Sequence, residues 1–326
     1  MRAPKVLLID EFHTHVHQHL TAFGFEVFDY KDILASEVLS VISTIQPEGL
    51  LLRSKIRIDE IVLKAGGCLR WVGRGGAGMD NIDEQAADKL EVYCFNAGEA
   101  NADAVGEHAM AMLLALFTKL LPAHTGVVNG QWDREENRGI ELKGSTIGIL
   151  GYGNTGSSVA QKLVGFGVKI IAHDKYLSGF SNGYVKEVSE QELLACSDIL
   201  TLHVPLTADT QDWLNASRIA QISKPFWLLN LSRGGVVDIQ AVLDGLNQGK
   251  ILGFAADVLA SEPPMKGTVL FQHCFLALTE KSNVVFSPHI AGWTVESHRK
   301  ISEIIVDKVL KLYTIEREIL KFTPRQ

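Results

Sequence analysis

The sequence predicts an α/β protein built from two doubly wound parallel-sheet domains. Short apolar runs alternate with segments whose apolar residues recur at helical spacing, which is typical of parallel βα units. This alternation begins twice, once at the start of the chain and again after a long helical pattern near residue 100. A glycine-rich turn opens the second series, and 326 residues suffice for two domains of ordinary size.

Taken in order, the elements support this division. The strands expected in the first hundred residues cover 5–10, 25–30, 49–53, 69–74 and 92–97. A helix is expected over about 101–121. The strands expected in the second series cover 146–151, 168–173, 198–204, 226–232, 251–258 and 284–288. Ser189 to Glu192 reads as a capping box that opens a helix, and Asp238 is the expected N-cap of another.

Composition narrows the class of protein. The net charge is −7 and no Lys/Arg-rich run occurs, which argues against a nucleic-acid-binding surface. The four cysteines form no CxxC pair, so buried thiols in a reducing compartment are expected. The first apolar run leads into Asp10 and Glu11, unlike a signal peptide, and the longest apolar run, 109–117, is too short to cross a bilayer. We therefore expect a soluble cytoplasmic protein.

The histidine-rich stretch 12–20 has two interpretations. His13 and His17, and likewise His15 and His19, are four residues apart and can share a helix face. One face supplies only two ligands, whereas a zinc site needs three or four that converge. A solvated helix is therefore expected here, with incidental metal binding as the alternative and no metal site assigned.

The glycine loop predicts dinucleotide binding. Gly151, Gly153 and Gly156 follow an apolar strand and open a helical run, and Asp174 ends the next strand. The first glycine permits the tight turn, the second lets backbone approach a pyrophosphate, and the third lets helix and strand pack closely. The helix N-terminus then faces the phosphates. Asp174 can accept both ribose hydroxyls and would repel a 2′-phosphate, so NAD is expected, although Lys175 weakens that preference.

Chemistry is expected where the strands of this sheet end, because ligands of open parallel sheets bind at the carboxyl ends of strands. Arg233, Asp257 and His289 each follow a strand, and Glu262 lies five residues after Asp257. With NAD alongside, an Arg can hold a carboxylate, a His can remove a hydroxyl proton, and a Glu can fix the tautomer of that His. Each residue alone also has a structural interpretation: a turn-capping Arg, a surface Glu, a structural His.

The chain resembles the D-isomer-specific 2-hydroxyacid dehydrogenase family over nearly its full length. The motifs that carry the resemblance occur at 51–55, 73–83, 96–116, 130–156, 203–207, 230–238, 255–264 and 287–294. The resemblance implies a flavodoxin-like substrate domain over 1–98 and 292–326 and a Rossmann NAD-binding domain over 99–291. It implies that Arg233, Glu262 and His289 are catalytic and that Asp257 binds the nicotinamide amide.

The resemblance also implies the remaining site residues. Those expected to bind NAD are Gly151, Gly153, Asn154, Thr155, Gly156, Asp174, His203, Val204, Pro205, Thr210, Leu231, Ser232, Asp257, Ala291 and Gly292. Those expected to bind substrate are Arg53, Ser54, Lys55, Gly76, Ala77, Gly78 and Asn101. Segment 132–138 is similar to the family's dimer arm, so a homodimer or a tetramer is expected.

Within the family the chain is most similar to the phosphoglycerate dehydrogenases, which implies oxidation of D-3-phosphoglycerate to 3-phosphohydroxypyruvate in serine biosynthesis. Lys55 departs from the family's pattern and offers a cation to a phosphate. Trp293 is bulkier than usual, and segment 264–283 is longer. The chain ends at Gln326, so no regulatory domain with serine feedback is expected.

Two other functions stay open. The first is a different substrate: glyoxylate, hydroxypyruvate or 4-phosphoerythronate. The second is an NAD-sensing binding protein without catalysis, which would not need the full set of Arg233, Glu262 and His289.

Overall fold

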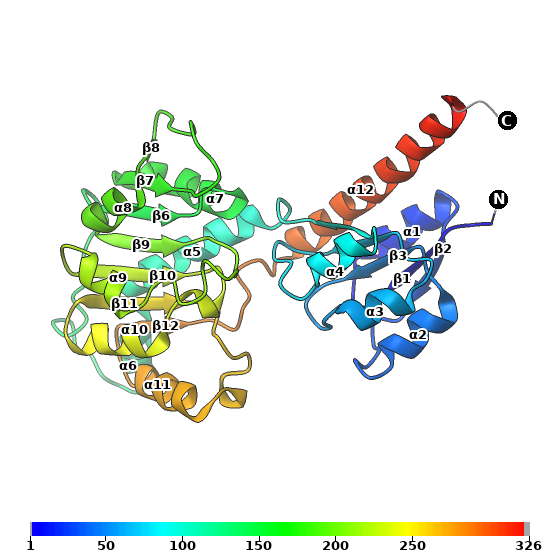
Figure 1. Ribbon diagram of the computed structural model, residues 1–326. Coiled ribbons are helices and arrows are strands. Elements are labelled where there is room, and N and C mark those ends of the chain that lie inside the picture. The colour runs from blue at the N-terminus through cyan, green and yellow to red at the C-terminus, as the bar shows by residue number, and fades with distance from the viewer. Residues whose placement is uncertain (1, 323–326) are drawn as a thin grey trace. The chain divides into compact units, whose positions relative to one another are not determined.

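The computed structural model describes residues 2–322, with side chains described up to residue 314. The chain divides into two compact units, which Figure 1 shows as one sheet each with helices on both faces. Unit 1 comprises residues 1–101 and 294–326, and unit 2 comprises residues 102–293. These divisions lie three residues after the expected 98/99 boundary (101 against 98) and two after the expected 291/292 boundary (293 against 291).

Unit 1 contains a five-stranded parallel sheet. Its strands are β1 (Lys5–Leu8), β2 (Glu26–Asp29), β3 (Gly49–Leu52), β4 (Trp71–Arg74) and β5 (Tyr93–Asn96). Their order is β2-β1-β3-β4-β5, which is the flavodoxin-like order. The order reverses between β1 and β3, so the loops that follow these adjacent strands lead to opposite faces of the sheet.

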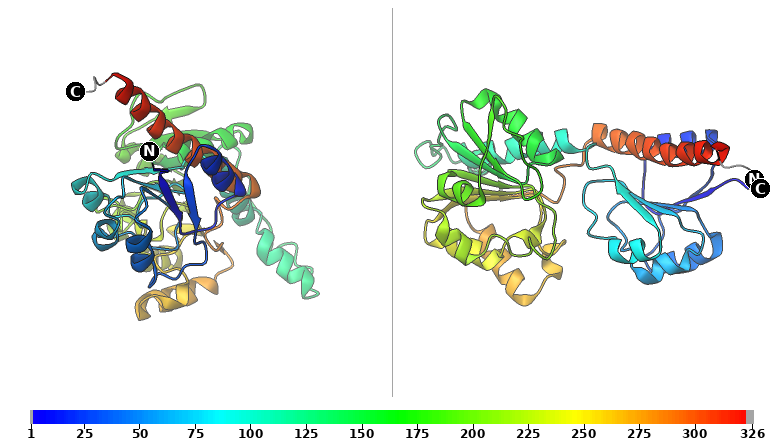
Figure 2. Two further views of the ribbon diagram at one scale, coloured as in Figure 1. Left: turned by 90° about the vertical axis from the view of Figure 1, so that its right-hand side faces the viewer. Right: turned by 45° about the horizontal axis from the view of Figure 1, so that its top comes forward.

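The helices of unit 1 cover both faces of this sheet, as the right-hand view of Figure 2 shows. One face packs against α1 (Thr14–Ala22) and α12 (Val295–Phe322) through a core that includes Val16, Leu20 and Ile305. The other face packs against α2 (Val38–Ile45), α3 (Glu60–Ala65) and α4 (Glu84–Lys89). The chain therefore returns to unit 1 to complete its second helical layer.

Unit 2 contains a seven-stranded parallel sheet. Its strands are β6 (Thr146–Leu150), β7 (Lys169–His173), β8 (Val185–Glu187), β9 (Ile199–Leu202), β10 (Phe226–Asn230), β11 (Ile251–Ala256) and β12 (Val284–Phe286). Their order is β12-β11-β10-β9-β6-β7-β8. This is the dinucleotide-binding order extended by one strand, with the reversal between β6 and β9.

Helices also cover both faces of the second sheet. One core includes side chains of α5 (Ala102–Phe117) and α7 (Asn154–Leu163). The opposite core includes side chains of α8 (Glu190–Cys196), α9 (Ala216–Gln221), α10 (Ile239–Asn247) and α11 (Val269–Thr279). The short 3-10 turns are η1 (Val164–Phe166), η2 (Gly234–Val236) and η3 (Pro264–Lys266). The predicted fold class of two doubly wound parallel sheets is confirmed.

Two expected elements differ from the structure. The helix expected over 101–121 ends at Phe117, Lys119 adopts a left-handed conformation, and a separate helix α6 (Leu120–Val128) follows. The reason is Pro122, because a proline inside a continuous helix would clash with the carbonyl of residue 118. The edge strand β8 was not expected, since three residues are too few to show a pattern.

The two side-chain N-caps are confirmed, whereas the Glu192 carboxylate, the second half of the predicted capping box, pairs with Lys186 Nζ at 2.6 Å. Ser189 Oγ accepts a hydrogen bond from the Glu192 N–H at 3.1 Å, at the start of α8. Asp238 Oδ1 accepts from the N–H groups of Gln240 and Ala241 at the start of α10. The long segment 264–283 forms η3 and α11, whose buried Phe271, Cys274 and Leu278 complete the core next to α10. This segment therefore has a packing role that its sequence did not reveal.

Among the described residues, no helix is by itself both long and apolar enough to cross a membrane. The consecutive helices α5 and α6 meet the length and composition criteria only as a pair, and they are bent by 64° relative to each other.

Burial of His203 predicts an acid-sensitive fold. Burial lowers the pKa of His203 to about 4, whereas an exposed histidine titrates near 6.5. The unfolded chain therefore binds the proton more readily, so this contribution to stability is full above pH 6.5 and is lost as the pH falls towards 4. At 1.36 kcal/mol per pKa unit, the loss approaches about 3 kcal/mol.

We expect the free energy of unfolding of the wild type to fall relative to that of His203→Gln between pH 7 and pH 4. Denaturant titrations of both proteins at each pH measure this difference, in which other titrating groups cancel. A difference that does not change with pH would show that His203 does not titrate in this way.

Candidate active site

The glycine loop follows β6 at the point where the strand order of unit 2 reverses. Gly151 has φ +88, and a Cβ there would lie 2.7 Å from the His203 carbonyl oxygen. A Cβ on Gly156 would lie 2.0 Å from the Gly151 carbonyl oxygen. At Gly153 a Cβ would meet no protein atom within 4 Å. Packing therefore requires glycine at 151 and 156, whereas at 153 the open space fits close approach of a ligand to the backbone.

The start of α7 suits a phosphate. Gly153 is its N-cap, and among the described residues no side chain caps this end; Asn154 and Thr155 form the first turn. The first N–H groups of a helix have no partner within it and carry its positive dipole end. The donor set and the open space at Gly153 thus fit the pyrophosphate of NAD.

Asp174 is held rigidly at the end of β7. Its Oδ2 accepts from the Tyr152 N–H at 2.8 Å, and its Oδ1 accepts from the N–H groups of Tyr176 and Leu177 at 2.9 Å each. Burial raises the pKa of Asp174, but these hydrogen bonds outweigh it and leave the pKa below the ordinary value. The carboxylate beside the glycine loop is therefore an anion, as ribose binding requires.

Lys175 forms an ion pair with Asp209. Its Nζ lies 2.6 Å from Asp209 Oδ2, on the loop that follows β9. The cation next to Asp174 thus has an anionic partner, which reduces what it can offer to a 2′-phosphate. This contact supports the preference for NAD.

His289 and Glu262, two of the three expected catalytic residues, form a hydrogen-bonded pair. His289 Nδ1 lies 2.8 Å from Glu262 Oε2, and Glu262 Oε1 accepts from the Leu259 N–H at 3.0 Å. A carboxylate that is ionised can only accept, so Nδ1 carries a proton, and in the neutral imidazole Nε2 is then the acceptor. Burial raises the pKa of Glu262, yet the hydrogen bond from His289, the Leu259 N–H and the charge of Arg233 together lower it.

Arg233 follows β10 in a turn that Asn230 organises. Asn230 is fully buried; its Nδ2 donates to the Arg233 carbonyl at 3.0 Å, and its Oδ1 accepts from Ser232 N–H and Oγ–H. A Cβ on Gly234 would lie 1.9 Å from the carbonyl carbon of Leu259, so glycine lets this turn touch the loop that leads to Glu262. Sequence reasoning did not identify Asn230, because a polar residue at the end of an apolar run gives no distinct signal.

Asp257 follows β11 and is only 2% exposed. Its carboxylate accepts from the N–H groups of Ile290 and Ala291 at 2.9 and 2.8 Å and from Ser287 Oγ at 2.5 Å. Its carbonyl oxygen accepts from the His289 N–H at 2.8 Å. The structure thus shows Asp257 anchoring the segment that carries His289; contact with the nicotinamide amide stays a prediction.

The other residues expected to bind NAD follow the carboxyl ends of three strands of unit 2. His203, Leu231, Ser232 and Ala291 are buried, and Thr210 Oγ1 donates to the Pro205 carbonyl at 2.6 Å. The positions of this group follow β9, β10 and β12 and comprise His203, Val204, Pro205, Thr210, Leu231, Ser232, Ala291 and Gly292. Their contacts to NAD stay predictions.

In unit 1, the loops expected to bind substrate follow β3 and β4, which are adjacent strands. The Arg53 N–H donates to Asp10 Oδ2 at 2.6 Å, across the point where the strand order reverses. Burial lowers the pKa of Arg53, against the opposing charges of Asp10 and Glu11. A Cβ on Gly76 would lie 1.9 Å from Arg74 Nη1, so the guanidinium of Arg74 lies against the second loop.

The remaining residues expected to bind substrate are distributed around these loops. Lys55 is exposed, and its Nζ donates to the Lys31 carbonyl at 3.2 Å, in the loop after β2. Asn81, which was not expected, donates through Nδ2 to the carbonyls of Arg53 and Ile56 and so fixes the 53–56 loop. The Oδ1 of Asn101 is buried and makes no hydrogen bond to the described residues. Ser54, Ala77 and Gly78 lie in the two loops themselves.

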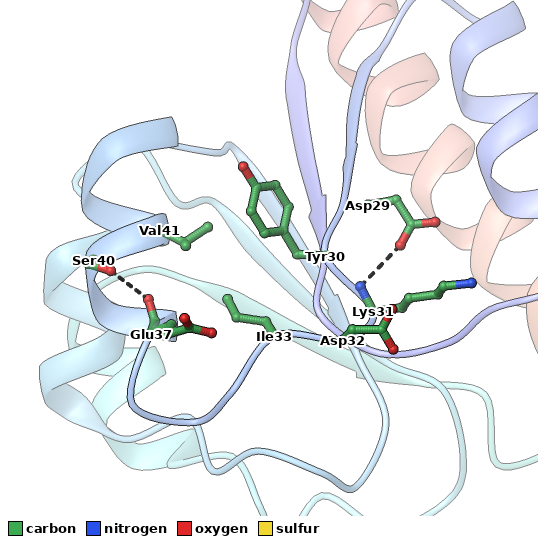
Figure 3. A pocket seen from close by; sticks show the side chains of 8 residues that line it. All are labelled: Asp29, Tyr30, Lys31, Asp32, Ile33, Glu37, Ser40 and Val41. Atoms are coloured by element: carbon green, nitrogen blue, oxygen red, sulfur yellow. Dashed lines mark hydrogen bonds between the residues drawn. The ribbon is translucent and has the colours of Figure 1, made fainter.

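A surface hollow in unit 1, shown in Figure 3, lies outside this set of residues. Its acidic groups bond locally: Asp29 accepts from the Lys31 N–H at 3.2 Å, and Glu37 accepts from the Leu34 N–H at 3.0 Å. Its lining comprises Asp29, Tyr30, Lys31, Asp32, Ile33, Glu37, Ser40 and Val41. Both hydrogen bonds lie within the segment 29–37.

The histidine-rich stretch begins α1. His13 Nδ1 accepts from the His15 N–H, and the rings of His15 and His19 stack with their centroids 3.7 Å apart. Across the part of the chain that the structure describes, no group of three or more His, Cys, Asp or Glu is arranged to hold a metal ion.

The sheet order, the glycine loop and the residues at the strand ends define a dinucleotide-binding dehydrogenase domain. Residues 110–291 match the NAD binding domain of the D-isomer specific 2-hydroxyacid dehydrogenases. The chain belongs to this family, and unit 2 is its NAD-binding domain.

Similar proteins agree with this assignment. The D-3-phosphoglycerate dehydrogenase of Archaeoglobus fulgidus is 31% identical over 310 residues, which cover 94% of this chain and 57% of the relative. The hydroxypyruvate reductase of Thermotoga maritima is 34% identical over 262 residues, which cover 80% of this chain and 83% of the relative. The solved structure of the PH0520 protein from Pyrococcus horikoshii matches with a TM-score of 0.79 at 28% identity, covering 95% and 92% of the two chains. The chain thus spans about half the length of the phosphoglycerate dehydrogenases that it matches.

Two glycine substitutions separate binding from folding. Gly153→Ala places its methyl group in open space, so the protein should keep its melting temperature, while the dissociation constant for NADH rises at least about tenfold, or 1.4 kcal/mol. Gly156→Ala forces a methyl group against backbone and should destabilise the fold by at least about 1–3 kcal/mol. Thermal unfolding and NADH fluorescence titration measure both effects. Unchanged NADH affinity in Gly153→Ala would show that the loop does not bind the phosphates of NADH.

Proposed function

We propose that the protein catalyses NAD-dependent hydride transfer between a D-2-hydroxy acid and its 2-oxo acid. The observation that carries this proposal is the 2.8 Å hydrogen bond between His289 and Glu262 at the strand ends of an NAD-binding sheet. Arg233, Glu262 and His289 are the catalytic residues in this proposal. A protein that only senses NAD has no need of such an oriented acid–base pair.

The geometry suggests how each residue acts. Bound NAD supplies the hydride acceptor. His289 Nε2 removes the proton of the substrate hydroxyl, because Nδ1 already donates to Glu262. Glu262 stabilises the imidazolium that results, and its lowered pKa keeps it ionised for this task. Arg233 holds the substrate carboxylate with a charge-assisted hydrogen bond.

The proposed substrate is D-3-phosphoglycerate, oxidised to 3-phosphohydroxypyruvate, the reaction of serine biosynthesis. Two observations support it: relatives that match over more than nine-tenths of this chain are named D-3-phosphoglycerate dehydrogenase, and two guanidinium groups, of Arg53 and Arg74, lie at adjacent strand ends of unit 1. The residues proposed to bind substrate are Arg53, Ser54, Lys55, Gly76, Ala77, Gly78 and Asn101.

Hydroxypyruvate reduction is the second candidate, and one contact favours it. The exposed Lys55 donates to a carbonyl of its own unit, so it is not preorganised for a phosphate. The hydroxypyruvate reductase of Thermotoga maritima also matches over 83% of its length, a larger share than the phosphoglycerate dehydrogenases show.

A homodimer is also part of the proposal. Helix α6 buries none of its residues, and its Leu120 and Val128 are 59% and 69% exposed. Trp132, in the arm that follows, is 77% exposed. A helix that leaves so much apolar surface uncovered is typical of a protein–protein interface, here with a second copy of the chain.

Substitution of His289 tests the acid–base role. His289→Ala should lower kcat by about 10²–10⁴-fold, the usual range for loss of a general base, while the dissociation constant for NADH stays within about twofold. Glu262→Gln should lower kcat less, because the imidazole remains. Stopped-flow turnover and fluorescence titration supply the two readouts, and turnover of His289→Ala at the wild-type rate would refute the assignment.

The substrate is tested by NADH consumption with 3-phosphohydroxypyruvate, hydroxypyruvate, glyoxylate and 2-oxo-3-hydroxy-4-phosphobutanoate at equal concentration. A kcat/KM for phosphohydroxypyruvate at least about a hundredfold higher, or nearly 3 kcal/mol of transition-state binding, is the expected result. Lys55→Ala should then raise the KM for the phosphorylated substrate more than for hydroxypyruvate, and Lys64→Ala, on the exposed face of α3, is the matched control. A preference for hydroxypyruvate or glyoxylate would favour the second candidate.

A further inference from the structure

His108 lies on α5 and has no part in the mechanism proposed above. Its Nε2 is 2.9 Å from Ser287 Oγ and 3.6 Å from Asp257 Oδ1, and its side chain is 23% exposed. Ser287 follows β12 and precedes His289 by two residues. The imidazole therefore contacts the segment that carries the proposed general base, from a different element of unit 2.

The hydrogen bonds of this group have one consistent direction. The Asp257 carboxylate accepts from two backbone N–H groups and, as an acceptor, takes the single hydroxyl proton of Ser287 at 2.5 Å. Met112 Sδ, at 3.7 Å from Ser287 Oγ, is too weak an acceptor to compete. His108 must then donate from Nε2 to Ser287 Oγ. The order of donation is His108 to Ser287 to Asp257.

Asp257, the last acceptor of this series, holds a strained backbone at His289. His289 has φ +57, a left-handed conformation that residues other than glycine seldom adopt. The His289 N–H donates to the Asp257 carbonyl, and the next two N–H groups donate to the Asp257 carboxylate. Such a conformation persists only where the surroundings over-determine it, and Asp257 supplies all three contacts.

We propose that His108 is a positioning residue for His289. By donating to Ser287, it fixes the Ser287 hydroxyl on Asp257, and the carboxylate in turn holds residues 289–291 in the conformation that directs His289 towards Glu262. The kinetic part of this inference rests on the proposed function, whereas the hydrogen-bond part does not.

The test compares His108→Leu, His108→Gln and His108→Asn in the full-length protein. The amide of glutamine reaches the position of Nε2, whereas that of asparagine does not. With hydroxypyruvate and NADH, we expect kcat to fall at least tenfold in His108→Leu and His108→Asn. In His108→Gln, kcat should stay within threefold of the wild-type value. The dissociation constant for NADH should change less than twofold in all three variants. His273→Leu, the same exchange at an exposed position of α11, is the matched control.

A second readout does not depend on activity. Hydrogen exchange at the amides of Ile290 and Ala291 should be at least tenfold faster in His108→Leu and His108→Asn and unchanged in His108→Gln and His273→Leu. Faster exchange in a protein without turnover would support the positioning role while refuting the proposed function. If His108→Leu does not fold, the comparison of His108→Gln with His108→Asn still tests the positioning role.

A double-mutant cycle completes the test. If His108 acts through Ser287, His108→Asn should add less than a twofold loss of kcat to Ser287→Ala. Three results would each overturn the proposal. The first is hydrogen exchange at Ile290 and Ala291 of His108→Asn at the wild-type rate. The others are equal turnover of the glutamine and asparagine variants, and independent losses of kcat in the double mutant.

Discussion

The carboxyl group of Asp257 is buried beneath the segment 287–291, and its hydrogen bonds determine the shape of that segment. A buried charge is tolerated only when it is fully hydrogen-bonded, and removal of one donor leaves it uncompensated. The segment therefore cannot relax from its left-handed turn at His289 without a cost at Asp257. The 2.8 Å contact between His289 and Glu262 depends on that turn, so the proposed chemistry depends on a group that need not take part in it.

Buried side chains also position exposed ones at other strand ends of unit 2. Fully buried Asn230 shapes the turn that carries Arg233, and Gly234 lets that turn touch the backbone at Leu259, from which the chain leads to Glu262. Side chains buried beneath the loops thus set where the exposed ones lie, as pre-organised sites require. In unit 1, Asn81 and Asp10 hold the 53–56 loop by the same principle.

The sequence predicted what depends on short-range pattern: both sheets, the helix caps at Ser189 and Asp238, and the glycine loop. It also predicted which residues follow strands, since a strand end is visible where an apolar run stops. It did not reveal Asn81 or His108, because each acts through partners distant in the chain, 179 positions away for His108 and Ser287. Asn230 acts on its near neighbours Ser232 and Arg233, but a single polar residue at the end of an apolar run gives no distinct signal. The break before α6 could have been found from Pro122, whereas the edge strand β8 is too short to show a period.

Our proposal assigns the reacting groups to unit 2 and substrate recognition to unit 1, and this assignment explains why the reaction class is easier to identify than the substrate. Hydroxyl and carboxylate are common to all 2-hydroxy acids, and in our proposal His289 and Arg233 of unit 2 act on these two groups alone. Discrimination must therefore come from groups that contact the rest of the substrate, which we assign to unit 1. In unit 1, the two cationic side chains are held to different degrees. Arg53 is half-buried next to Asp10, whereas Lys55 is exposed and donates to a neighbouring loop. A rigid guanidinium can distinguish a phosphate from a hydroxyl by geometry, whereas a mobile ammonium adds mainly charge. Of these two cations, Arg53 is thus the better suited to determine specificity in our proposal.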